Sequence, residues 1–460
     1  MCRKKTPFRW MNAWSGWVVS RLRPSRRRNL PVCSAPARCI LTRAGVFVQP
    51  AAVMPKGAFH CENAGHGMAA REAQVFREAL VASLKQKGDL TDPATEAALL
   101  AVPRHLFLPD LPLERAYADE AVPIKRDSDG TVLSSASQPS MMVIMLRQLQ
   151  LRPGDNVLEI GAGSGYNAAV MQHIVGQDGT VTSIEIDPQV AKEARLHLQR
   201  AGMGDVNIVD ADGALGYAPR ASYDRIIASV AVWDVPPAWE KQLKPDGILV
   251  APIGGAAQYS AAFRFEPDGS LYSRENVPCR FIALRGVAAG PAIYRRVNAS
   301  GLMLISDSIE QIDSVAVHVL LSEDAEENHL GAPLSAGEYW QGFLPYLELH
   351  APEGFIFTGY VVAENQPSYG LEGSGFALIT SGSACFVPFQ GYGQVHTFAG
   401  ADAFMALRDA LEAWDAAGRP SSDRLRMRLM AKKAGRPRPA GGMIYSRLYH
   451  DLVIWMDDRA

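Results

Sequence analysis

The sequence lacks the features that mark metalloproteins, disulfide frameworks and membrane-spanning proteins. It contains no H-E-x-x-H motif, no C-x-x-C pair and no cluster of histidines, so we expect no metal site. Of its six cysteines only Cys279 and Cys385 lie beyond residue 61, which argues against a disulfide framework and for a reducing cytosol. No apolar run reaches the ~18–20 residues of a membrane span. We therefore expect a soluble, cytoplasmic protein.

A large excess of one charge is also missing, although charge is unevenly distributed. The 460 residues carry a net charge of −2, which predicts no nucleic-acid or membrane partner for the chain as a whole. Residues 1–61, by contrast, hold twelve Lys and Arg and no Asp or Glu. Such a segment is typical of a nucleic-acid or membrane-binding arm or of a transit peptide. We favour a third interpretation, in which translation begins at Met54 or Met68 and residues 1–67 are a disordered or mis-assigned basic segment.

A glycine-rich turn after an apolar strand is the strongest positive signal. Residues 157–160 read Val-Leu-Glu-Ile and lead into Gly161, Gly163 and Gly165. This pattern predicts a cofactor pocket at the carboxyl end of the first strand of a doubly wound sheet. Dinucleotide-binding turns need a small residue where this chain has Tyr166. The spacing instead suits S-adenosylmethionine, which has no pyrophosphate, although such a turn taken alone is as often only a tight connection.

Two acids follow the next two apolar strands that we predict along the chain. Glu185 ends residues 181–185, where a carboxylate can accept both ribose hydroxyls, and Asp212 follows residues 206–209, where it can accept from an adenine amino group. Taken singly, each is more often a solvated loop acid. Their order behind successive strands favours a cofactor site. The predicted cofactor-binding residues are Glu159, Gly161, Gly163, Gly165, Asn167, Glu185, Asp212 and Gly213.

Segments on both sides of this turn resemble a known family. V-P-R-H-L-F-L-P at 102–109, A-Y-A-D-E-A-V-P-I at 116–124 and S-A-S-Q-P at 135–139 precede it. V-P-P at 235–237, Q-L-K-P-D-G at 242–247 and P-I-G-G at 252–255 follow it. In this order they resemble the protein-L-isoaspartate O-methyltransferases from about residue 85 to residue 255. The resemblance implies S-adenosylmethionine-dependent methylation of the isoaspartyl carboxylate in proteins or peptides.

The resemblance also implies that Ser137 is the active-site serine. Pro139 suits the first turn of a helix, so a substrate carboxylate at the helix start would meet unpaired backbone N–H groups and the Ser137 hydroxyl. Without the resemblance, a serine here is more often a helix cap. A carboxylate is already ionised at neutral pH, so no general base is required and Ser137 would orient the acceptor. The predicted substrate contacts are Ser135, Gln138, Val232 and Trp233.

Three local features depart from the pattern of that family. Ser135-Ala136 stands where Thr-Ile is common, which trims apolar bulk beside the serine. Residues 125–131 form a charged, hairpin-like insert in place of a short glycine-rich link. Val232-Trp233-Asp234 replaces smaller residues, and an aromatic side chain at the pocket rim would reshape peptide selection.

The fold class that we predict is α/β with an added domain. Residues 68–290 should form a doubly wound, mostly parallel Rossmann-like methyltransferase sheet. Within 256–300 we expect a hairpin that runs from 261–265 through a turn at 267–269 to 281–286 and completes an antiparallel edge, and residues 291–460 should form an α+β accessory domain. In the latter we expect a helix with Phe404, Leu407, Leu411 and Trp414 on one face. Strands are predicted at 314–321, 354–362, 375–380, 384–389, 425–429 and 452–456. This domain serves either packing or dimerisation, or peptide recognition; the oligomeric state is not predicted.

Repair of damaged proteins is the function that we predict first. Methylation turns the carboxylate into an ester that can release methanol, so the neighbouring backbone nitrogen can attack the ester carbonyl and close a succinimide that hydrolyses partly to normal aspartate. A second interpretation is a dedicated aspartate methyltransferase that matures one ribosomally made peptide by the same chemistry, because the chain resembles extended, actinobacterial-type members of the family and some relatives of that kind act on such peptides. A third interpretation is an adaptor that binds isoaspartyl groups without methyl transfer. The three differ in which carboxylate is presented and in whether it is methylated.

Overall fold

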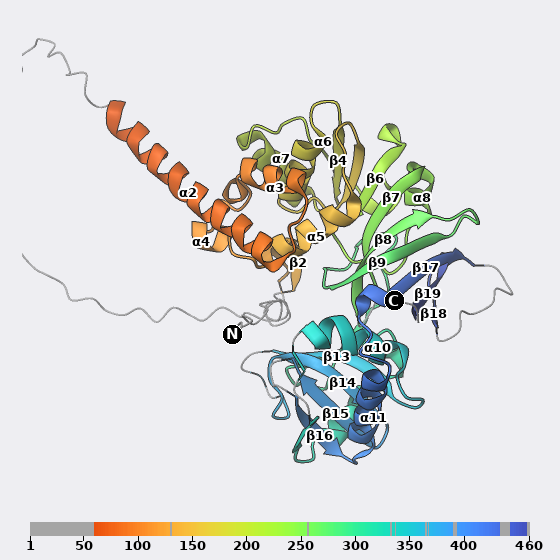
Figure 1. Ribbon diagram of the computed structural model, residues 1–460. Coiled ribbons are helices and arrows are strands. Elements are labelled where there is room, and N and C mark those ends of the chain that lie inside the picture. Colours follow the sequence, from red (N-terminus) through yellow and green to blue (C-terminus); the bar gives the residue numbers. More distant parts are fainter. Residues whose placement is uncertain are drawn as a thin grey trace, which may run out of the picture.

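The structure, a computed structural model, describes residues 59–128, 131–254, 257–331, 334–335, 337–363, 366, 368–389, 393–432 and 442–457. It contains two units, a ten-stranded sheet with its helices and a seven-stranded sheet that lies below it in Figure 1. Residues 1–58 of the predicted basic segment lie outside the described residues. The rest of that segment falls within helix α2, which begins at Phe59, before the predicted domain start at residue 68.

Helices and one hairpin precede the large sheet. Asp92 caps α3 by accepting from the Thr95 amide, and Pro93 follows it at the first helical position. The predicted charged insert does form a hairpin, in which β1 and β2 pair antiparallel and the Asp127 amide donates to the Thr131 carbonyl. The elements are α2 (Phe59–Lys87), α3 (Pro93–Ala101), η2 (Arg104–Phe107), α4 (Leu113–Ala116), β1 (Val122–Arg126), β2 (Val132–Ala136) and α5 (Pro139–Leu149).

The parallel part of the large sheet winds outward in both directions from β3. Its order is β5-β4-β3-β6-β7, and every neighbouring pair is parallel. Because the chain leaves β3 on one side and returns on the other, a crevice opens at the carboxyl end of β3. The elements are β3 (Asn156–Ile160), α6 (Tyr166–Val175), β4 (Thr180–Glu185), α7 (Pro188–Arg200), β5 (Asn207–Asp210), η3 (Gly213–Leu215), η4 (Ala218–Arg220), β6 (Tyr223–Ala228), α8 (Pro237–Gln242) and β7 (Leu243–Gly254). The predicted doubly wound α/β fold is confirmed.

Apolar side chains cover both faces of this parallel sheet. Val157 packs with α2, α3, α5, α6 and α7 on one face, whereas Leu158 and Ile160 pack with Trp239 of α8 on the other. Ile226, in the middle of β6, is fully buried. Burial on both faces explains why these strands read as continuous apolar runs in the sequence.

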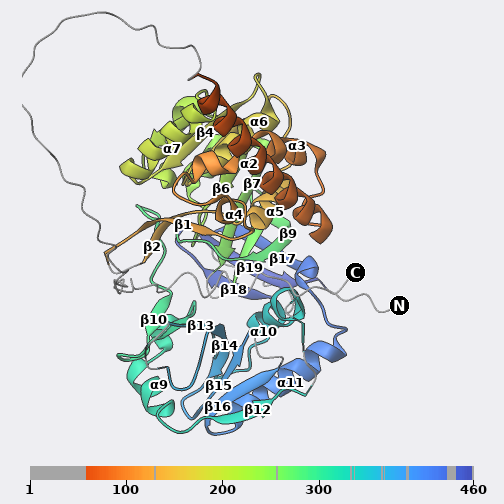
Figure 2. The same cartoon turned by 90° about the vertical axis from the view of Figure 1, so that its left-hand side faces the viewer.

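Five antiparallel strands extend the sheet beyond β7. A hairpin is present, as predicted, but its strands are β8 (Gln258–Phe265) and β9 (Leu271–Cys279), and the predicted second strand at 281–286 lies outside it. The hairpin is not the edge, because β17 (Leu425–Ala431) pairs with β9, followed by β19 (His450–Met456) and β18 (Met443–Ser446). The predicted domain 291–460 is thereby corrected: its last strands belong to the large sheet, and only residues up to α11 belong to the second unit (Figures 1 and 2). Pairing between strands so far apart leaves no local signal in the sequence.

The second unit is an antiparallel sheet of order β10-β11-β13-β14-β15-β16-β12. One of its two cores lies under α11, where Leu407, Leu411 and Trp414 are buried as predicted. Its strands are β10 (Tyr294–Arg296), β11 (Leu302–Ile305), β12 (Glu326–His329), β13 (Ile356–Val362), β14 (Ser374–Ile379), β15 (Ser383–Pro388) and β16 (Gln394–Ala399). Its helical elements are η5 (Ile309–Gln311), α9 (Ser314–Leu320), η6 (Glu338–Phe343, π-helical), α10 (Leu344–Leu349) and α11 (Asp402–Ala416). The short η7 (Ser422–Arg424) follows α11 and leads into β17 of the large sheet.

One predicted strand, 314–321, is helix α9. Its alternating valines imitate strand periodicity, but Asp313 accepts from the amides of Val315 and Ala316 and so caps a helix. Val317 and Leu321 are buried one helical turn apart, and Val315 is left 66% exposed. The capping acid outweighs the strand preference of β-branched residues.

The two units contact each other through a hydrogen bond and through a buried apolar side chain. The Tyr259 hydroxyl in β8 donates to Glu348 of α10 at 2.9 Å, and the adjacent Leu349 is buried in the core of the large sheet. Burial raises the pKa of Glu348 to about 8. No helix among the described residues has both the length and the apolar character needed to cross a bilayer.

Candidate active site

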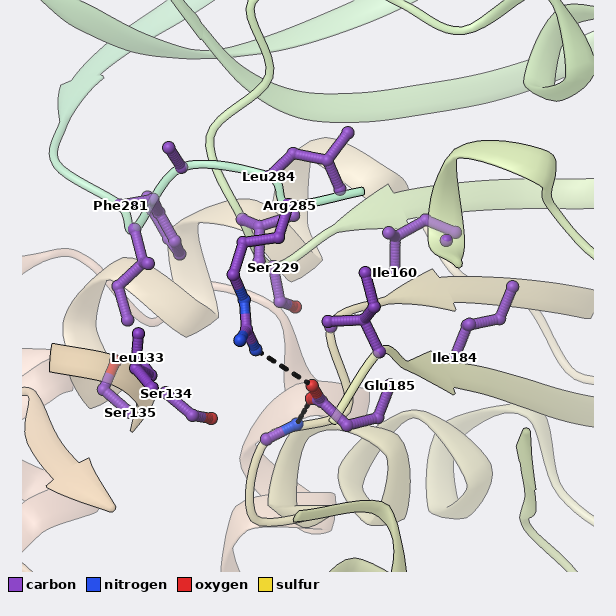
Figure 3. A pocket seen from close by; sticks show the side chains of 17 residues that line it. Leu133, Ser134, Ser135, Ile160, Ile184, Glu185, Ser229, Phe281, Leu284 and Arg285 are labelled. Carbon is purple, nitrogen blue, oxygen red and sulfur yellow. Dashed lines mark hydrogen bonds and ion pairs between the residues drawn. The ribbon is translucent and has the colours of Figure 1, made fainter. Parts of the chain in front are cut away.

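A cavity opens at the carboxyl ends of β3, β4 and β6, where the strand order reverses (Figure 3). Its empty space, open mouth included, measures about 590 Å³. The glycine turn forms part of its wall, and the segment 281–285 lies across from it. The lining residues are Leu133, Ser134, Ser135, Ile160, Gly161, Gly163, Ile184, Glu185, Ile186, Gly213, Ser229, Val230 and residues 281–285.

The glycine turn brings bare backbone to the cavity. Gly161, Gly163 and Gly165 all have positive φ, at 93°, 54° and 87°. A β-carbon on Gly163 would stand 3.2 Å from the Ser135 carbonyl oxygen, and one on Gly161 would stand 2.9 Å from Val230. Both conformation and space therefore require glycine here. Of the three, Gly161 and Gly163 line the cavity, and Gly165 instead packs against Ala194 of α7.

Glu185 points into the cavity from the end of β4 (Figure 3). Its Oε2 accepts from the Gly163 amide at 3.0 Å and its Oε1 from the Asp187 amide at 3.2 Å. Burial raises the pKa of this carboxyl, while the two amides and the nearby Arg285 act in the opposite direction. A carboxylate held in this way retains further lone pairs for hydroxyl donors of a ligand.

Arg285 was not predicted as a site residue. Its Nη2 lies 3.8 Å from Glu185 Oε1, across the cavity (Figure 3). It belongs to residues 281–285, which we predicted as a strand of a hairpin. They instead bridge to the loop after β6, since the Ala231 amide donates to the Ile282 carbonyl and the Leu284 amide to the Ala231 carbonyl. An apolar run flanked by arginines was the only local signal.

Glu159 lies beneath the glycine turn and is fully buried. It accepts hydrogen bonds from Ser183 Oγ at 2.6 Å, Asn167 Nδ2 at 2.8 Å and Ser229 Oγ at 2.9 Å. Burial raises its pKa to about 7, against the effect of these three donors. Two of the predicted cofactor-binding residues, Glu159 and Asn167, thus contact each other.

Ser137 lines a second hollow of about 330 Å³ on the other side of the turn. The two hollows share Ser135, Gly161, Gly163 and Ser229, so a ligand lying along the turn would reach from Glu185 to Ser137. The remaining residues of this second hollow are Arg104, Ala136, Met142, Glu159, Ala162, Ser164, Tyr166 and Asn167.

Ser137 does not cap α5. The cap position is Gln138, and its side chain donates to the Asp119 carbonyl instead of capping. Asp119 Oδ1 accepts from the Ser140 amide at 2.9 Å. The predicted open helix start is therefore partly occupied by Asp119, and the Ser137 hydroxyl has no partner that would commit it to a capping role among the described residues.

Several predicted contacts do not line either hollow. Asp212 caps η3 through the Ala214 amide, and its other oxygen accepts from the Val287 amide at 2.8 Å. Val232 is 1% exposed and pairs with β7. Trp233 packs against the core of the second unit, and Cζ of Arg447 lies 3.4 Å from the centre of the Trp233 ring. Gln138 is buried, whereas Ser135 and Gly213 do reach the cavity.

These residues fit S-adenosylmethionine. The turn offers glycine backbone where a β-carbon would collide, and Glu185 offers acceptor oxygens in the cavity. Among the residues that the structure describes, no three His, Cys, Asp or Glu side chains gather as a metal site would require.

The part of the chain that forms this site is similar to known proteins. Residues 75–289 match the protein-L-isoaspartate(D-aspartate) O-methyltransferase family. The chain is 39% identical over 210 residues to protein-L-isoaspartate O-methyltransferase 2 of Archaeoglobus fulgidus. The aligned region covers 46% of this chain and 93% of the relative. The chain is also 39% identical over 222 residues to the Methanopyrus kandleri enzyme of that name, covering 47% and 96%.

Solved structures of the same name are also similar to the chain. One structure of a protein-L-isoaspartate O-methyltransferase has 24% sequence identity to the chain and a TM-score of 0.45. The match covers 76% of this chain and 96% of the chain in that structure. A second, described as putative, from Plasmodium falciparum and in complex with S-adenosyl-L-homocysteine, has 18% identity and a TM-score of 0.40, covering 45% and 98%. The family match ends at residue 289, before β10, so the second unit and β17–β19 lie outside it.

Proposed function

The chain belongs to the protein-L-isoaspartate O-methyltransferase family, and from this membership we propose that it methylates the free carboxylate of isoaspartyl residues in proteins or peptides. The observation that carries the proposal is 39% identity to relatives of which the chain spans more than nine-tenths. It is a methyltransferase, and S-adenosylmethionine is its cofactor, as predicted. The predicted family, enzyme class and activity are therefore confirmed at this level.

Three groups of this chain would hold the cofactor. Glu185 would accept from hydroxyls, the Gly161–Gly163 backbone would lie against the ligand, and the Glu159–Asn167 pair would set the floor beneath the turn. When bound, the cofactor supplies the methyl group as an electrophile. Asp212 is not part of this proposal, because it lines neither hollow.

Ser137 would orient the acceptor. The substrate carboxylate is ionised at neutral pH, so methyl transfer needs alignment, and positioning contributes up to roughly 7–11 kcal/mol in favourable cases. The hydroxyl lines the hollow next to the glycine turn and does not serve as the α5 cap. These two observations support an active-site role for Ser137.

Repair in the cytosol is the biological role that we propose. In the methyl ester, the backbone nitrogen of the next residue attacks the ester carbonyl, methoxide leaves with a proton as methanol, and a succinimide closes. Water then opens the ring, partly to normal aspartate. Cys279 and Cys385 are free and buried, which suits a reducing compartment.

The decisive experiment compares two peptides that differ in one linkage. The full chain is incubated with methyl-labelled S-adenosylmethionine and either an isoaspartyl peptide or its aspartyl counterpart, and base-labile methyl ester is counted. We expect label on the isoaspartyl peptide alone. Label on neither, with S-adenosylhomocysteine still bound, would contradict the proposal and favour an adaptor or an enzyme dedicated to one peptide.

Replacing Ser137 tests its role separately. We expect Ser137→Ala to lower turnover about tenfold to a hundredfold, because a hydrogen bond to a charged acceptor is lost, and to leave the affinity for S-adenosylhomocysteine unchanged. Ser128→Ala, in the charged hairpin, is the matched control and should retain full turnover. Normal turnover of Ser137→Ala would remove this serine from the mechanism.

A further inference from the structure

The family motif at 102–109 contains a buried arginine that the proposed mechanism does not use. Arg104 is 1% exposed and lines the same hollow as Ser137. Its Nε donates to the Ala116 carbonyl at 3.0 Å and its Nη2 to the Ser137 carbonyl at 2.9 Å. Its Nη1 is buried and has no hydrogen-bond partner.

Arg104 differs from the other buried arginines of the described residues. Arg225 lies 3.6 Å from Asp155, and Arg447 lies 2.9 Å from Asp307. No carboxylate of the described residues comes within 4.0 Å of Arg104, whose cation lies over the Tyr166 ring at 4.9 Å. A guanidinium stays protonated in proteins, and burying a cation is costly unless an anion compensates it.

The surroundings of the hollow cannot supply that anion. Glu159, the acid that lines it, already accepts from Ser183, Asn167 and Ser229. Asp119 accepts from the Ser140 amide and pairs with Lys87 at 2.5 Å. A second orphan, Asn167 Oδ1, is buried in the wall of the same hollow. The hollow is therefore built for a polar ligand that completes these groups.

We propose that Arg104 is a ligand-binding residue whose free Nη1 donates to a carboxylate bound beside Ser137. The proposal rests on the proposed function, in which two carboxylates enter this site. One belongs to the amino-acid end of the cofactor, and the other is the isoaspartyl carboxylate that accepts the methyl group. Through Nη2 on the Ser137 carbonyl, the same guanidinium would fix the position of the serine backbone beside that carboxylate.

Ligand pairs that differ only in the carboxylate distinguish the two sources. The cofactor pair is S-adenosylhomocysteine and its decarboxylated analogue. The peptide pair is an isoaspartyl peptide and its α-carboxamide counterpart, bound in the presence of S-adenosylhomocysteine. Dissociation constants are measured by calorimetry or fluorescence anisotropy for the full chain and for Arg104→Met. Because the readout is binding, it does not depend on whether methyl transfer occurs.

For the wild-type chain we expect loss of the relevant carboxylate to weaken binding about tenfold to a hundredfold. In Arg104→Met, the ratio of dissociation constants between the ligand without the carboxylate and the ligand with it should fall below about threefold for one of the two ligand pairs. For the other pair the ratio should stay at its wild-type value. The pair that changes identifies the carboxylate. Arg225→Met, which removes a buried arginine away from both hollows, should keep both ratios. Wild-type ratios for both pairs in Arg104→Met would overturn the proposal.

Loss of an arginine that holds two backbone carbonyls can prevent folding, so a second measurement uses the unaltered protein. A crystal structure of the wild-type chain with S-adenosylhomocysteine and the isoaspartyl peptide would place a carboxylate oxygen within hydrogen-bond distance of Arg104 Nη1. A water molecule or a backbone carbonyl on Nη1 in that complex would overturn the proposal. Absence of ester formation with a carboxylate on Nη1 would contradict the proposed function alone.

Discussion

Glu185 connects the ends of two strands through its carboxylate. It accepts from the Gly163 amide in the turn after β3 and from the Asp187 amide after β4, and it faces the cavity. Arg285 approaches it from the opposite wall. A single side chain therefore shapes the turn and presents acceptor oxygens to the ligand.

Removing the charge of Glu185 should weaken cofactor binding. We expect Glu185→Gln to raise the dissociation constant of S-adenosylhomocysteine about tenfold to a hundredfold, because charge-assisted hydrogen bonds from ligand hydroxyls become neutral ones. Isothermal calorimetry measures it. Glu193→Gln, on the exposed face of α7, is the matched control and should bind normally. An unchanged affinity in Glu185→Gln would show that ligand hydroxyls find other acceptors.

At the residue scale the sequence predicted what depends on local order. Glu185 follows an apolar strand at a typical distance from the glycine turn, so its place at the cavity could be inferred. Trp233 could not be placed, because the Arg447 that covers it comes from the far end of the chain. Arg285 and Arg104 were missed for the same reason: their contacts in the site depend on the tertiary fold.

At the scale of elements, the glycine turn and the segment 281–285 form two opposite walls of the cavity. The turn was predictable, since three alternate glycines follow an apolar strand and acids follow the next two strands in the order of a cofactor site. The segment was predicted as a strand because its apolar composition suits one. It is held instead by Gln258, whose Oε1 accepts from the Phe281 amide at 2.9 Å, and by backbone pairing with Ala231.

A valine in the turn should abolish binding with limited loss of stability. Gly163→Val places a side chain at φ 54° and 3.2 Å from the Ser135 carbonyl, next to the amide that Glu185 accepts from. Gly154→Val is the matched control, since Gly154 has φ 85° but nothing within 4 Å of a β-carbon. Both variants should lose about 1–2 kcal/mol of stability from the positive φ.

Only Gly163→Val should lose binding of S-adenosylhomocysteine. Thermal unfolding with and without the ligand measures stability and binding together. Equal ligand-induced stabilisation in the two variants would contradict the role of the turn. Unfolding of Gly163→Val alone would mean that the Ser135 contact is needed for the fold itself.

At the scale of the whole molecule, the turn between β18 and β19 contacts both the loop after β6 and the second unit. Asp234, in the loop after β6, accepts from the amides of Tyr449 and His450 and from His450 Nδ1 at 2.8 Å. His450 Nε2 lies 3.2 Å from Glu240 of α8. Nearby, Arg447 joins Trp233 to Asp307 of the second unit. The carboxyl-terminal strands are therefore part of the methyltransferase unit, although the family match does not include them.

This arrangement predicts a pH-dependent stability. Burial lowers the pKa of His450, but Asp234 and Glu240 outweigh burial and raise it to about 9. A pKa raised on folding means that the protonated histidine stabilises the folded chain fully below its ordinary value near 6.5. That contribution is lost as the pH rises from about 6.5 to about 9, and it amounts to about 3 kcal/mol.

We therefore compare the free energy of unfolding of the wild type with that of His450→Gln. The wild type should be the more stable of the two at pH 6, and its advantage should be smaller by about 3 kcal/mol at pH 10. Urea unfolding at a series of pH values, followed by tryptophan fluorescence, measures this difference, because Trp233 and Trp239 lie in or beside the segments that His450 joins. His173→Gln, on the exposed end of α6, is the matched control for the loss of a histidine side chain. A difference between wild type and His450→Gln that stays constant with pH would mean that His450 is neutral in the folded chain, and that the backbone amides of residues 449 and 450 alone hold Asp234.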